Sequence, residues 1–171
     1  MKIVVFGPVA SGKTTLAKIL QEELNLPLYQ MDFIVHDDEN HIRRDEKTQV
    51  KMINDIFKKE KEWIIEGTPR NHWEMLSAAA TMIIYLDREK PLLRWRLFLR
   101  HVKIQLRIEK VPYKLDKDFY KRMLDYINQD QKELLKWLIK RYPTKLVILK
   151  KDKEYQKLLK AIKEGEIYKY Q

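Results

Sequence analysis

Eight residues near the start of the chain, from Gly7 to Thr14, have the types and spacing of a phosphate-binding loop. They read Gly-Pro-Val-Ala-Ser-Gly-Lys-Thr and satisfy the pattern G-x-x-x-x-G-K-[S/T]. An apolar run precedes them and an amphipathic stretch follows, which is the strand–loop–helix context that the pattern requires. In a chain of this composition the pattern arises by chance fewer than about one time in a thousand. The alternative, an ordinary glycine turn between a strand and a helix, is the weaker interpretation.

Each part of this loop has a defined chemical task. Its glycines let successive backbone N–H groups curl around phosphate oxygens, and the first turn of the following helix adds partial positive charge. Lys13 would reach the β- and γ-phosphates, and the Thr14 hydroxyl would bind Mg²⁺. We therefore expect a nucleoside triphosphate as the ligand. The expected contacts are Gly7, Ala10, Ser11, Gly12, Lys13, Thr14 and Thr15.

A second group of polar side chains follows the apolar run at residues 63–66. The segment 66–70 reads Glu-Gly-Thr-Pro-Arg and would lie at the carboxyl edge of an open parallel sheet, where ligands bind. Glu66 would hold the hydrated Mg²⁺, and the two-pronged guanidinium of Arg70 would bind an acceptor phosphate. The alternative is a plain Gly-Pro turn with a solvated Glu and Arg.

A stripe of basic residues lies on a helix expected over residues 91–107. The basic stripe comprises Arg96, Arg100, Lys103 and Arg107, and an adjoining apolar stripe comprises Leu92, Trp95, Leu99, Val102 and Leu106. We expect the apolar stripe to pack on the core. Arg96 and Arg100 would stabilise the charge on a transferring phosphoryl group after substrate binds. The alternative is a solvated basic face.

Asp32 follows the strand expected at residues 28–31, so its carboxylate would also lie at the carboxyl edge of the sheet. The alternatives are a helix-capping role and a solvated loop. The four histidines, His36, His41, His72 and His101, show no metal-ligand spacing, and we expect them at the surface or its boundary.

The elements that must position these residues alternate along the chain. Short apolar runs predict strands at residues 2–6, 28–31, 63–66, 81–86 and 145–149. Helical spacing of apolar residues predicts helices at residues 14–24, 44–61, 91–107, 117–141 and 154–163, with a short one at 71–77. The connections are too long for hairpins. We therefore expect an α/β fold of the P-loop NTPase type, a five-stranded parallel sheet flanked by helices.

Length and composition exclude several classes of protein. The chain has 171 residues, which predicts a single domain, and its 44% hydrophobic content excludes a disordered polyelectrolyte. The absence of cysteine excludes disulfides, a thiol nucleophile and a Cys-based zinc site, and it favours the cytoplasm. No apolar run approaches the roughly 18 residues of a membrane span, and no signal-peptide cleavage site follows the N-terminus, so no membrane partner is expected.

The net charge of +10 is distributed unevenly. Residues 1–86 hold 11 basic and 13 acidic side chains, whereas residues 87–171 hold 24 and 12. Such an excess in one half is typical of proteins that meet nucleic acid, a membrane surface or a polyphosphate substrate.

The phosphate loop, the segment 66–70 and the residues after Tyr85-Leu86-Asp87 resemble the adenylate-kinase-like family of P-loop kinases. The family's equivalent of segment 66–70 reads Asp-Gly-x-Pro-Arg, so this chain departs from it with Glu66. Counted from Asp87, Arg96 and Arg100 fall where the family places arginines that contact the ATP base and phosphates.

The resemblance implies ATP and Mg²⁺ as cofactors, and Asp32 as a carboxylate that orients or deprotonates an acceptor hydroxyl. It also implies that residues 150–152 frame the adenine, mainly through their backbone. The family's long lid insert is absent, so we expect a short helical lid over about residues 100–125. In its size and in the segment Trp63-Ile64-Ile65-Glu66-Gly67, the chain most resembles the bacterial DNA topology modulation proteins.

Three functional hypotheses remain open from the sequence. The first is a kinase that transfers the ATP γ-phosphate to a nucleotide, a nucleoside or another small hydroxyl compound. The second choice is a P-loop protein that binds DNA and affects its topology. The third is a non-catalytic nucleotide-binding regulator. The sequence leaves the acceptor and the oligomeric state open.

Overall fold

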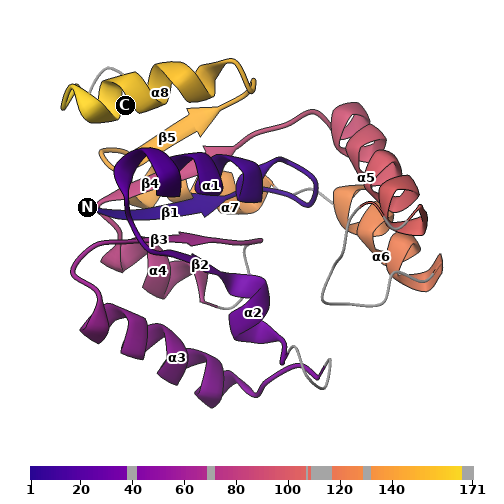
Figure 1. Ribbon diagram of the computed structural model, residues 1–171, viewed down its shortest axis with the longest axis horizontal. Helices are drawn as coiled ribbons and strands as arrows, with labels where there is room; N and C mark the ends of the chain where they lie inside the picture. Colours follow the sequence, from indigo (N-terminus) through magenta and orange to yellow (C-terminus); the bar gives the residue numbers. More distant parts are fainter. Residues whose placement is uncertain (38–41, 69–71, 107, 109–116, 129–131, 167–171) are drawn as a thin grey trace.

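In the computed structural model, which describes residues 1–37, 42–68, 72–106, 108, 117–128 and 132–166, five parallel strands form one sheet. The strands are β1 (Lys2–Phe6), β2 (Leu28–Gln30), β3 (Trp63–Glu66), β4 (Met82–Leu86) and β5 (Leu146–Leu149). Their order across the sheet is β2-β3-β1-β4-β5 (Figure 1). Every residue of β3 and β4 is buried, because helices cover both faces of the sheet. The predicted five-stranded parallel sheet is confirmed.

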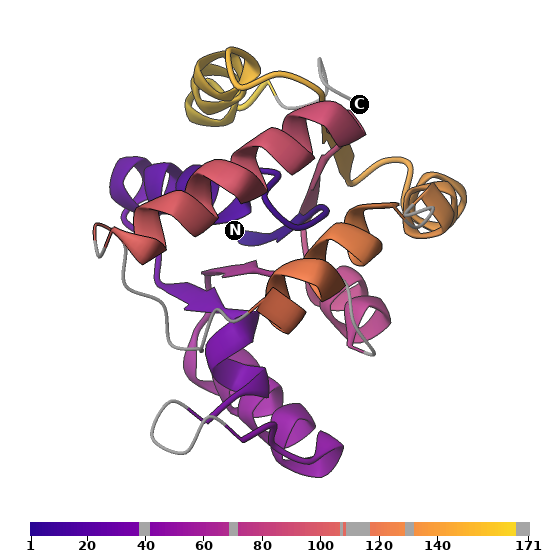
Figure 2. The same cartoon turned by 90° about the vertical axis from the view of Figure 1, so that its right-hand side faces the viewer.

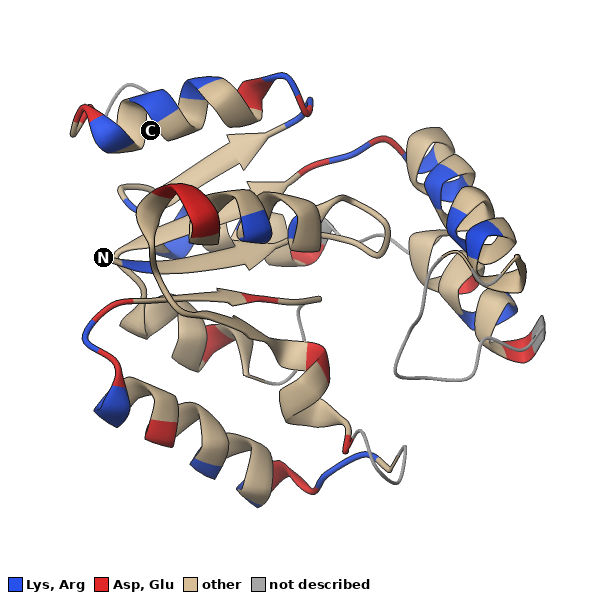
Figure 3. Ribbon diagram, in the orientation of Figure 1, with Lys and Arg blue, Asp and Glu red and all other residues tan. Residues whose placement is uncertain are grey.

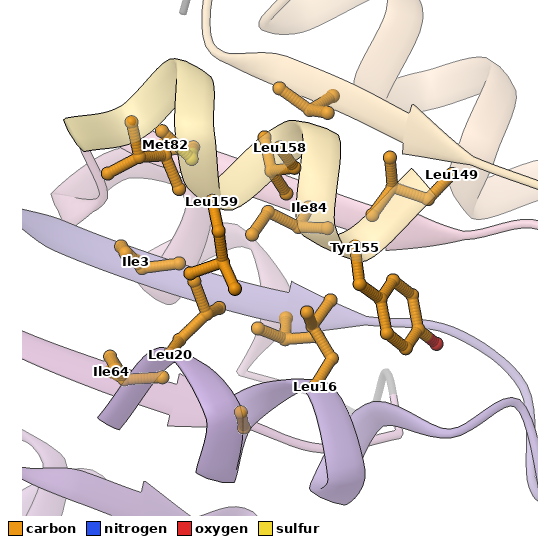
Figure 4. Close-up of a cluster of buried hydrophobic side chains, with 14 of the residues drawn as sticks. Ile3, Leu16, Leu20, Ile64, Met82, Ile84, Leu149, Tyr155, Leu158 and Leu159 are labelled. Atoms are coloured by element: carbon orange, nitrogen blue, oxygen red, sulfur yellow. The ribbon is translucent and has the colours of Figure 1, made fainter. Parts of the chain in front are cut away.

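Two layers of helices enclose this sheet. The helices in the described residues are α1 (Lys13–Leu24), α2 (Met31–Val35), α3 (Glu46–Lys59), α4 (Trp73–Ala79), α5 (Lys90–Gln105), α6 (Lys117–Asn128), α7 (Lys132–Arg141) and α8 (Glu154–Lys163). Helices α1 and α8 cover one face, where Leu20 and Leu159 lie near Ile3 (Figure 4). Helices α2, α3, α4 and α7 cover the other face, with Trp63 fully buried there. No helix in the described residues has both the length and the apolar character to cross a bilayer.

Helices α5 and α6 form a pair that lies beyond the carboxyl ends of the strands (Figures 1 and 2). Leu93 and Leu97 of α5 pack with Ile127 of α6, and Val9 and Ala10 of the phosphate loop contact the same cluster. This small core places the pair directly against the loop. The short helical lid predicted over about residues 100–125 stays a prediction, because residues 107 and 109–116 lie outside the described part of the chain.

Local sequence signals set several helix ends. The Asp45 carboxylate caps α3 by accepting a hydrogen bond from the Thr48 backbone N–H at 2.9 Å. Helix α1 ends at Asn25, which adopts a left-handed φ of 52°. Gly165 follows the end of α8 and adopts a left-handed φ of 69°, which glycine accommodates without steric cost.

The single helix predicted for residues 117–141 is wrong. Helix α6 ends at Asn128 and α7 begins at Lys132, and they pack in different places: Ile127 against α5, and Leu138 against the sheet. Helical spacing of apolar residues continues across the boundary, so periodicity alone joins the two. The short helix α2 was not predicted either, and Met31 begins it instead of ending β2.

The predicted packing face of α5 is also wrong. Leu92, Trp95, Leu99 and Leu106 are exposed, Trp95 to 57% and Leu106 to 64%. Leu93 and Leu97 are buried instead, because α6 covers that side of the helix. Helix α5 is apolar on two sides, so the sequence pattern could not show which side meets a neighbour.

Candidate active site

A cavity of about 930 Å³ lies at the carboxyl edge of the sheet, where the phosphate loop, α5 and the turn after β5 converge. Its lining includes six polar residues predicted from the sequence: Lys13, Thr14, Asp32, Glu66, Arg96 and Arg100. Ala10, Gly12 and Thr15 also line it, whereas Gly7 and Ser11 belong to the loop without lining the cavity. One cavity thus gathers residues from four separate stretches of the chain.

The phosphate loop has a conformation that depends on its glycines. Gly12 adopts a φ of 96°, in the left-handed region, and a Cβ on Gly7 would lie 3.0 Å from the Leu86 backbone oxygen. Gly12 also provides no side-chain cap, so the first-turn N–H groups of α1 remain as donors at the cavity. The Ser11 hydroxyl is buried without a hydrogen-bond partner in the described residues. This set of donors fits the phosphate oxygens of a nucleotide.

Lys13 and Thr14 both turn toward the middle of the site. Lys13 is buried, and its Nζ donates to the Pro8 backbone oxygen at 2.8 Å across the loop. The Thr14 hydroxyl donates to Glu66 Oε1 at 2.9 Å. The two residues predicted to hold the metal, from segments 52 positions apart, are therefore in direct contact.

Glu66 lies at the end of β3 and is only 5% exposed. Burial raises the pKa of its carboxyl, and the nearby charge of Asp32 raises it further. The charges of Lys13 and Arg100 and the Thr14 hydrogen bond lower the pKa but do not offset the burial. A buried carboxylate in this position would be stabilised by a cation.

The residues at this point fit Mg²⁺. In the described part of the chain no group of three or more His, Asp or Glu side chains could enclose a metal ion. Mg²⁺ does not need such a cage, because it retains several waters and takes one or two carboxylates together with substrate phosphates. Glu66, the Thr14 hydroxyl and nucleotide phosphates would supply that set.

Arg96 and Arg100 extend from α5 into the cavity wall. The Arg96 guanidinium donates to the Ser11 backbone oxygen at 3.2 Å and also pairs with Asp152, in the turn after β5. Figure 3 shows α5 as basic along its length, and the helix contains no acidic residue. Three members of the predicted basic stripe, Arg96, Arg100 and Lys103, line the cavity.

Asp32 lies in the first turn of α2 and lines the cavity from the side of β2. Its side chain is exposed, and its negative charge raises the pKa of the Glu66 carboxyl. Arg70, the predicted acceptor-binding residue, and Arg107, the last of the basic stripe, lie outside the described residues, as does His41.

His72 is buried, so the prediction that it lies at the surface or its boundary is wrong. It precedes α4, and its Nε2 donates to Gln49 Oε1 of α3 at 2.8 Å. The ring of His101, on α5, contacts Tyr120 of α6 at a centroid distance of 4.8 Å. Neither histidine lines the cavity.

Sequence reasoning missed Arg88, Tyr155 and the side chain of Asp152. Arg88 follows β4 and is buried, with NH2 donating to Asp152 Oδ1 and to the Tyr155 hydroxyl, each at 2.9 Å. Asp152 and Tyr155 both line the cavity. The signal available was position: Arg88 is the second residue after β4, and a charged residue just after a buried strand of a parallel sheet lies at the edge where ligands bind.

Comparison with known proteins identifies the fold. No protein-family model matches the chain. A shikimate kinase from Flavobacterium psychrophilum is 34% identical over 61 residues, which make up 36% of this chain and 30% of that protein. The crystal structure of a shikimate kinase from Bacteroides thetaiotaomicron matches with a TM-score of 0.57 at 17% identity, covering 96% of this chain and 97% of that one.

A gluconokinase from Sinorhizobium meliloti matches with a TM-score of 0.55 at 12% identity, covering 99% of this chain and 93% of that one. The chain has the P-loop kinase fold. The expectation of a P-loop fold with a flanked five-stranded parallel sheet is confirmed over nearly the whole chain.

Proposed function

We propose that this protein is an ATP-dependent kinase that transfers the γ-phosphoryl group of ATP to a hydroxyl of a small acceptor. The observation that carries the proposal is the contact between Thr14 of the phosphate loop and Glu66 of β3, beside Lys13. This contact brings together the phosphate loop, the carboxylate proposed to bind the metal (Glu66) and the cation proposed to bind phosphate (Lys13).

In the proposed reaction, the phosphate loop binds the triphosphate and Lys13 reaches its β- and γ-phosphates. Arg96 and Arg100 stabilise the negative charge that spreads over the transferring group. Thr14 and Glu66 would hold Mg²⁺, which when bound would neutralise part of the negative charge of the phosphates. These residues do little covalent chemistry, because phosphoryl transfer depends on positioning and electrostatic stabilisation.

On the acceptor side, Asp32 would accept the proton of the acceptor hydroxyl. The hydroxyl oxygen then forms a bond to the γ-phosphorus, and the bond from that phosphorus to the bridging oxygen of ADP breaks. Gln30, Phe33 and Thr68 line the same cavity as Asp32 and would contact the acceptor. Arg70 is the proposed anchor for an acidic group of the acceptor.

The acceptor class is proposed from the comparisons. The similar proteins are named as kinases of shikimate and gluconate, which are both hydroxy acids. An acceptor of that kind would use Asp32 for its hydroxyl and the proposed anchor Arg70 for its carboxylate. Nucleosides and nucleoside monophosphates, the acceptors suggested by the adenylate-kinase-like resemblance, are the second acceptor class.

The test is an ATP-consumption screen against small hydroxy acids, nucleosides, nucleoside monophosphates and DNA with a 5′-hydroxyl. The proposal expects Mg²⁺-dependent ADP formation with a small-molecule acceptor and its loss in Lys13→Ala. Full transfer activity in Lys13→Ala would overturn it. Tight ATP binding without turnover on any acceptor would support the regulator hypothesis instead.

The DNA hypothesis, suggested by the resemblance to DNA topology modulation proteins, keeps a separate test. Three members of the basic stripe line the cavity, which favours a small phosphorylated ligand over an extended phosphate backbone. DNA binding at low salt that falls steeply as salt increases would support the DNA hypothesis. A cytoplasmic location remains a prediction that fits each hypothesis.

A further inference from the structure

A buried arginine behind the nucleotide side of the cavity is tied to the sheet. The Arg88 side chain is fully buried, and its guanidinium donates to the Leu149 backbone oxygen at 2.7 Å and to the Tyr155 hydroxyl at 2.9 Å. These two partners belong to β5 and α8. Burying a guanidinium is costly unless its donors are satisfied in a fixed geometry. NH1 and NH2 of Arg88 have such partners, whereas Nε is buried without one in the described residues. The bonds of NH1 and NH2 make Arg88 a fixed point of the fold.

Asp152 links this fixed point to α5. Its Oδ1 accepts from Arg88 NH2 at 2.9 Å, and its Oδ2 accepts from Arg96 NH2 on α5. Arg96 NH1 donates to the Ser11 backbone oxygen of the phosphate loop at 3.2 Å. A continuous chain of hydrogen bonds thus runs from the sheet, through one carboxylate, to an arginine held against the phosphate loop.

Asp152 stays ionised in this setting. Burial acts to raise its pKa, but the hydrogen bond and charge of Arg96 and the charge of Arg88 lower it below the usual value. A carboxylate that holds one arginine with each oxygen fixes the direction of both guanidinium planes.

We propose that Asp152 is a positioning residue, which orients Arg96 toward the phosphate loop for the phosphoryl transfer. The inference rests on the proposed function. The Asp152 side chain is 51% exposed, so its pair with Arg96 contributes little to folding stability. Asp152 instead determines the position of the Arg96 guanidinium. Displacing a group that acts in the transition state by about 1 Å can reduce the rate of the chemical step by about 100-fold.

A double-mutant cycle tests this role. Asp152→Asn keeps an amide oxygen for Arg88 but removes the charge that orients Arg96. We expect kcat to fall by about 10-fold to 100-fold, with a smaller change in the KM for ATP. We expect the double variant Asp152→Asn/Arg96→Ala to be no slower than Arg96→Ala alone. Because Asp152→Asn also removes the carboxylate charge beside the buried Arg88, its thermal midpoint is measured as well, and kcat is compared at a temperature at which both proteins are fully folded.

The matched control is the substitution Asp125→Asn, which removes an exposed carboxylate of α6 and should leave kcat unchanged. The same cycle measured as the Kd of a non-hydrolysable ATP analogue gives a readout that needs no acceptor. Independent effects of Asp152 and Arg96 in both readouts, or no effect of Asp152→Asn in either, would overturn the inference. A wild type that binds the analogue but never consumes ATP would overturn the proposed function alone.

Discussion

The Thr14 hydroxyl and the Glu66 carboxylate meet at 2.9 Å, joining the start of α1 to the end of β3. Strands β1 and β3 are neighbours in register, with Val5 opposite Glu66, so the sheet itself brings the phosphate loop and this carboxylate together. The contact follows from topology, because parallel neighbours end at the same edge. It gives the first prediction.

Glu66→Gln should abolish Mg²⁺-dependent turnover while stabilising the ligand-free protein at neutral pH. Because burial raises the pKa of Glu66, ionisation at neutral pH costs folding stability, and this cost disappears when the pH falls below the ordinary carboxyl pKa. The amide keeps an acceptor for Thr14. Urea denaturation of both proteins at pH 7.5 and pH 4.5 should show a clearly larger advantage for Glu66→Gln at the higher pH. A wild type equally stable or more stable at pH 7.5 would contradict this.

Lys13→Ala should lower ATP turnover by at least about 100-fold, because it removes the cation of the phosphate loop that would reach the β- and γ-phosphates. Steady-state ADP release measures the effect. Lys51→Ala, an exposed lysine of α3, is the matched control and should retain wild-type activity. Similar losses in both variants would point to general charge rather than to the site.

Gly67→Ala should destabilise the fold by about 1–3 kcal/mol and impair ATP turnover. A Cβ at this position would lie 2.6 Å from Met31 Cβ, so β3 and α2 would have to separate beside the cavity. Gly165→Ala is the comparison. Its Cβ would meet nothing within 4 Å, and only the backbone strain at a φ of 69° would be felt, about 1 kcal/mol. Thermal unfolding and ATP turnover are measured for both variants. They distinguish the effect of the steric contact at residue 67 from the effect of backbone strain at residue 165.

The buried His72 should make the protein sensitive to mild acid. Burial lowers the pKa of this imidazole, so the folded protein holds it neutral while the unfolded chain protonates it near its ordinary pKa of 6.5. Folding stability should therefore decrease as the pH falls below about 6.5. In His72→Gln the stability should change less between pH 7 and pH 5. An identical pH dependence in the two proteins would remove His72 as the cause.

The sequence was sufficient for the sheet and the phosphate loop, because both depend on local signals. A β-branched run followed by the Gly7–Thr14 pattern defines strand, loop and helix within one short stretch. The positions of Asp32 and Glu66 followed from the rule that parallel strands end at a common edge. Asp32 and Glu66 line one cavity together with Lys13 and Thr14 of the phosphate loop.

Sequence reasoning failed where long-range packing decides the outcome. The side of α5 that packs is set by α6, so Trp95 is exposed and Leu97 is buried although both belong to apolar patterns. The boundary between α6 and α7 carries no strong breaker, and only the different destinations of Ile127 and Leu138 separate them. The role of Arg88 depends on partners more than 60 positions away.

The α5–α6 pair is connected to the sheet at both of its ends. Helix α5 follows β4, while α7, whose Leu138 is buried in the core, leads from α6 into β5. Strands β4 and β5 are neighbours, so the two attachments lie close together on one edge. Two neighbouring attachments, together with the packing of Val9 and Ala10 on the pair, resist its displacement along the sheet edge. Arg96, which donates to the Ser11 backbone oxygen, is therefore held against the phosphate loop by a helix pair that is anchored at both ends.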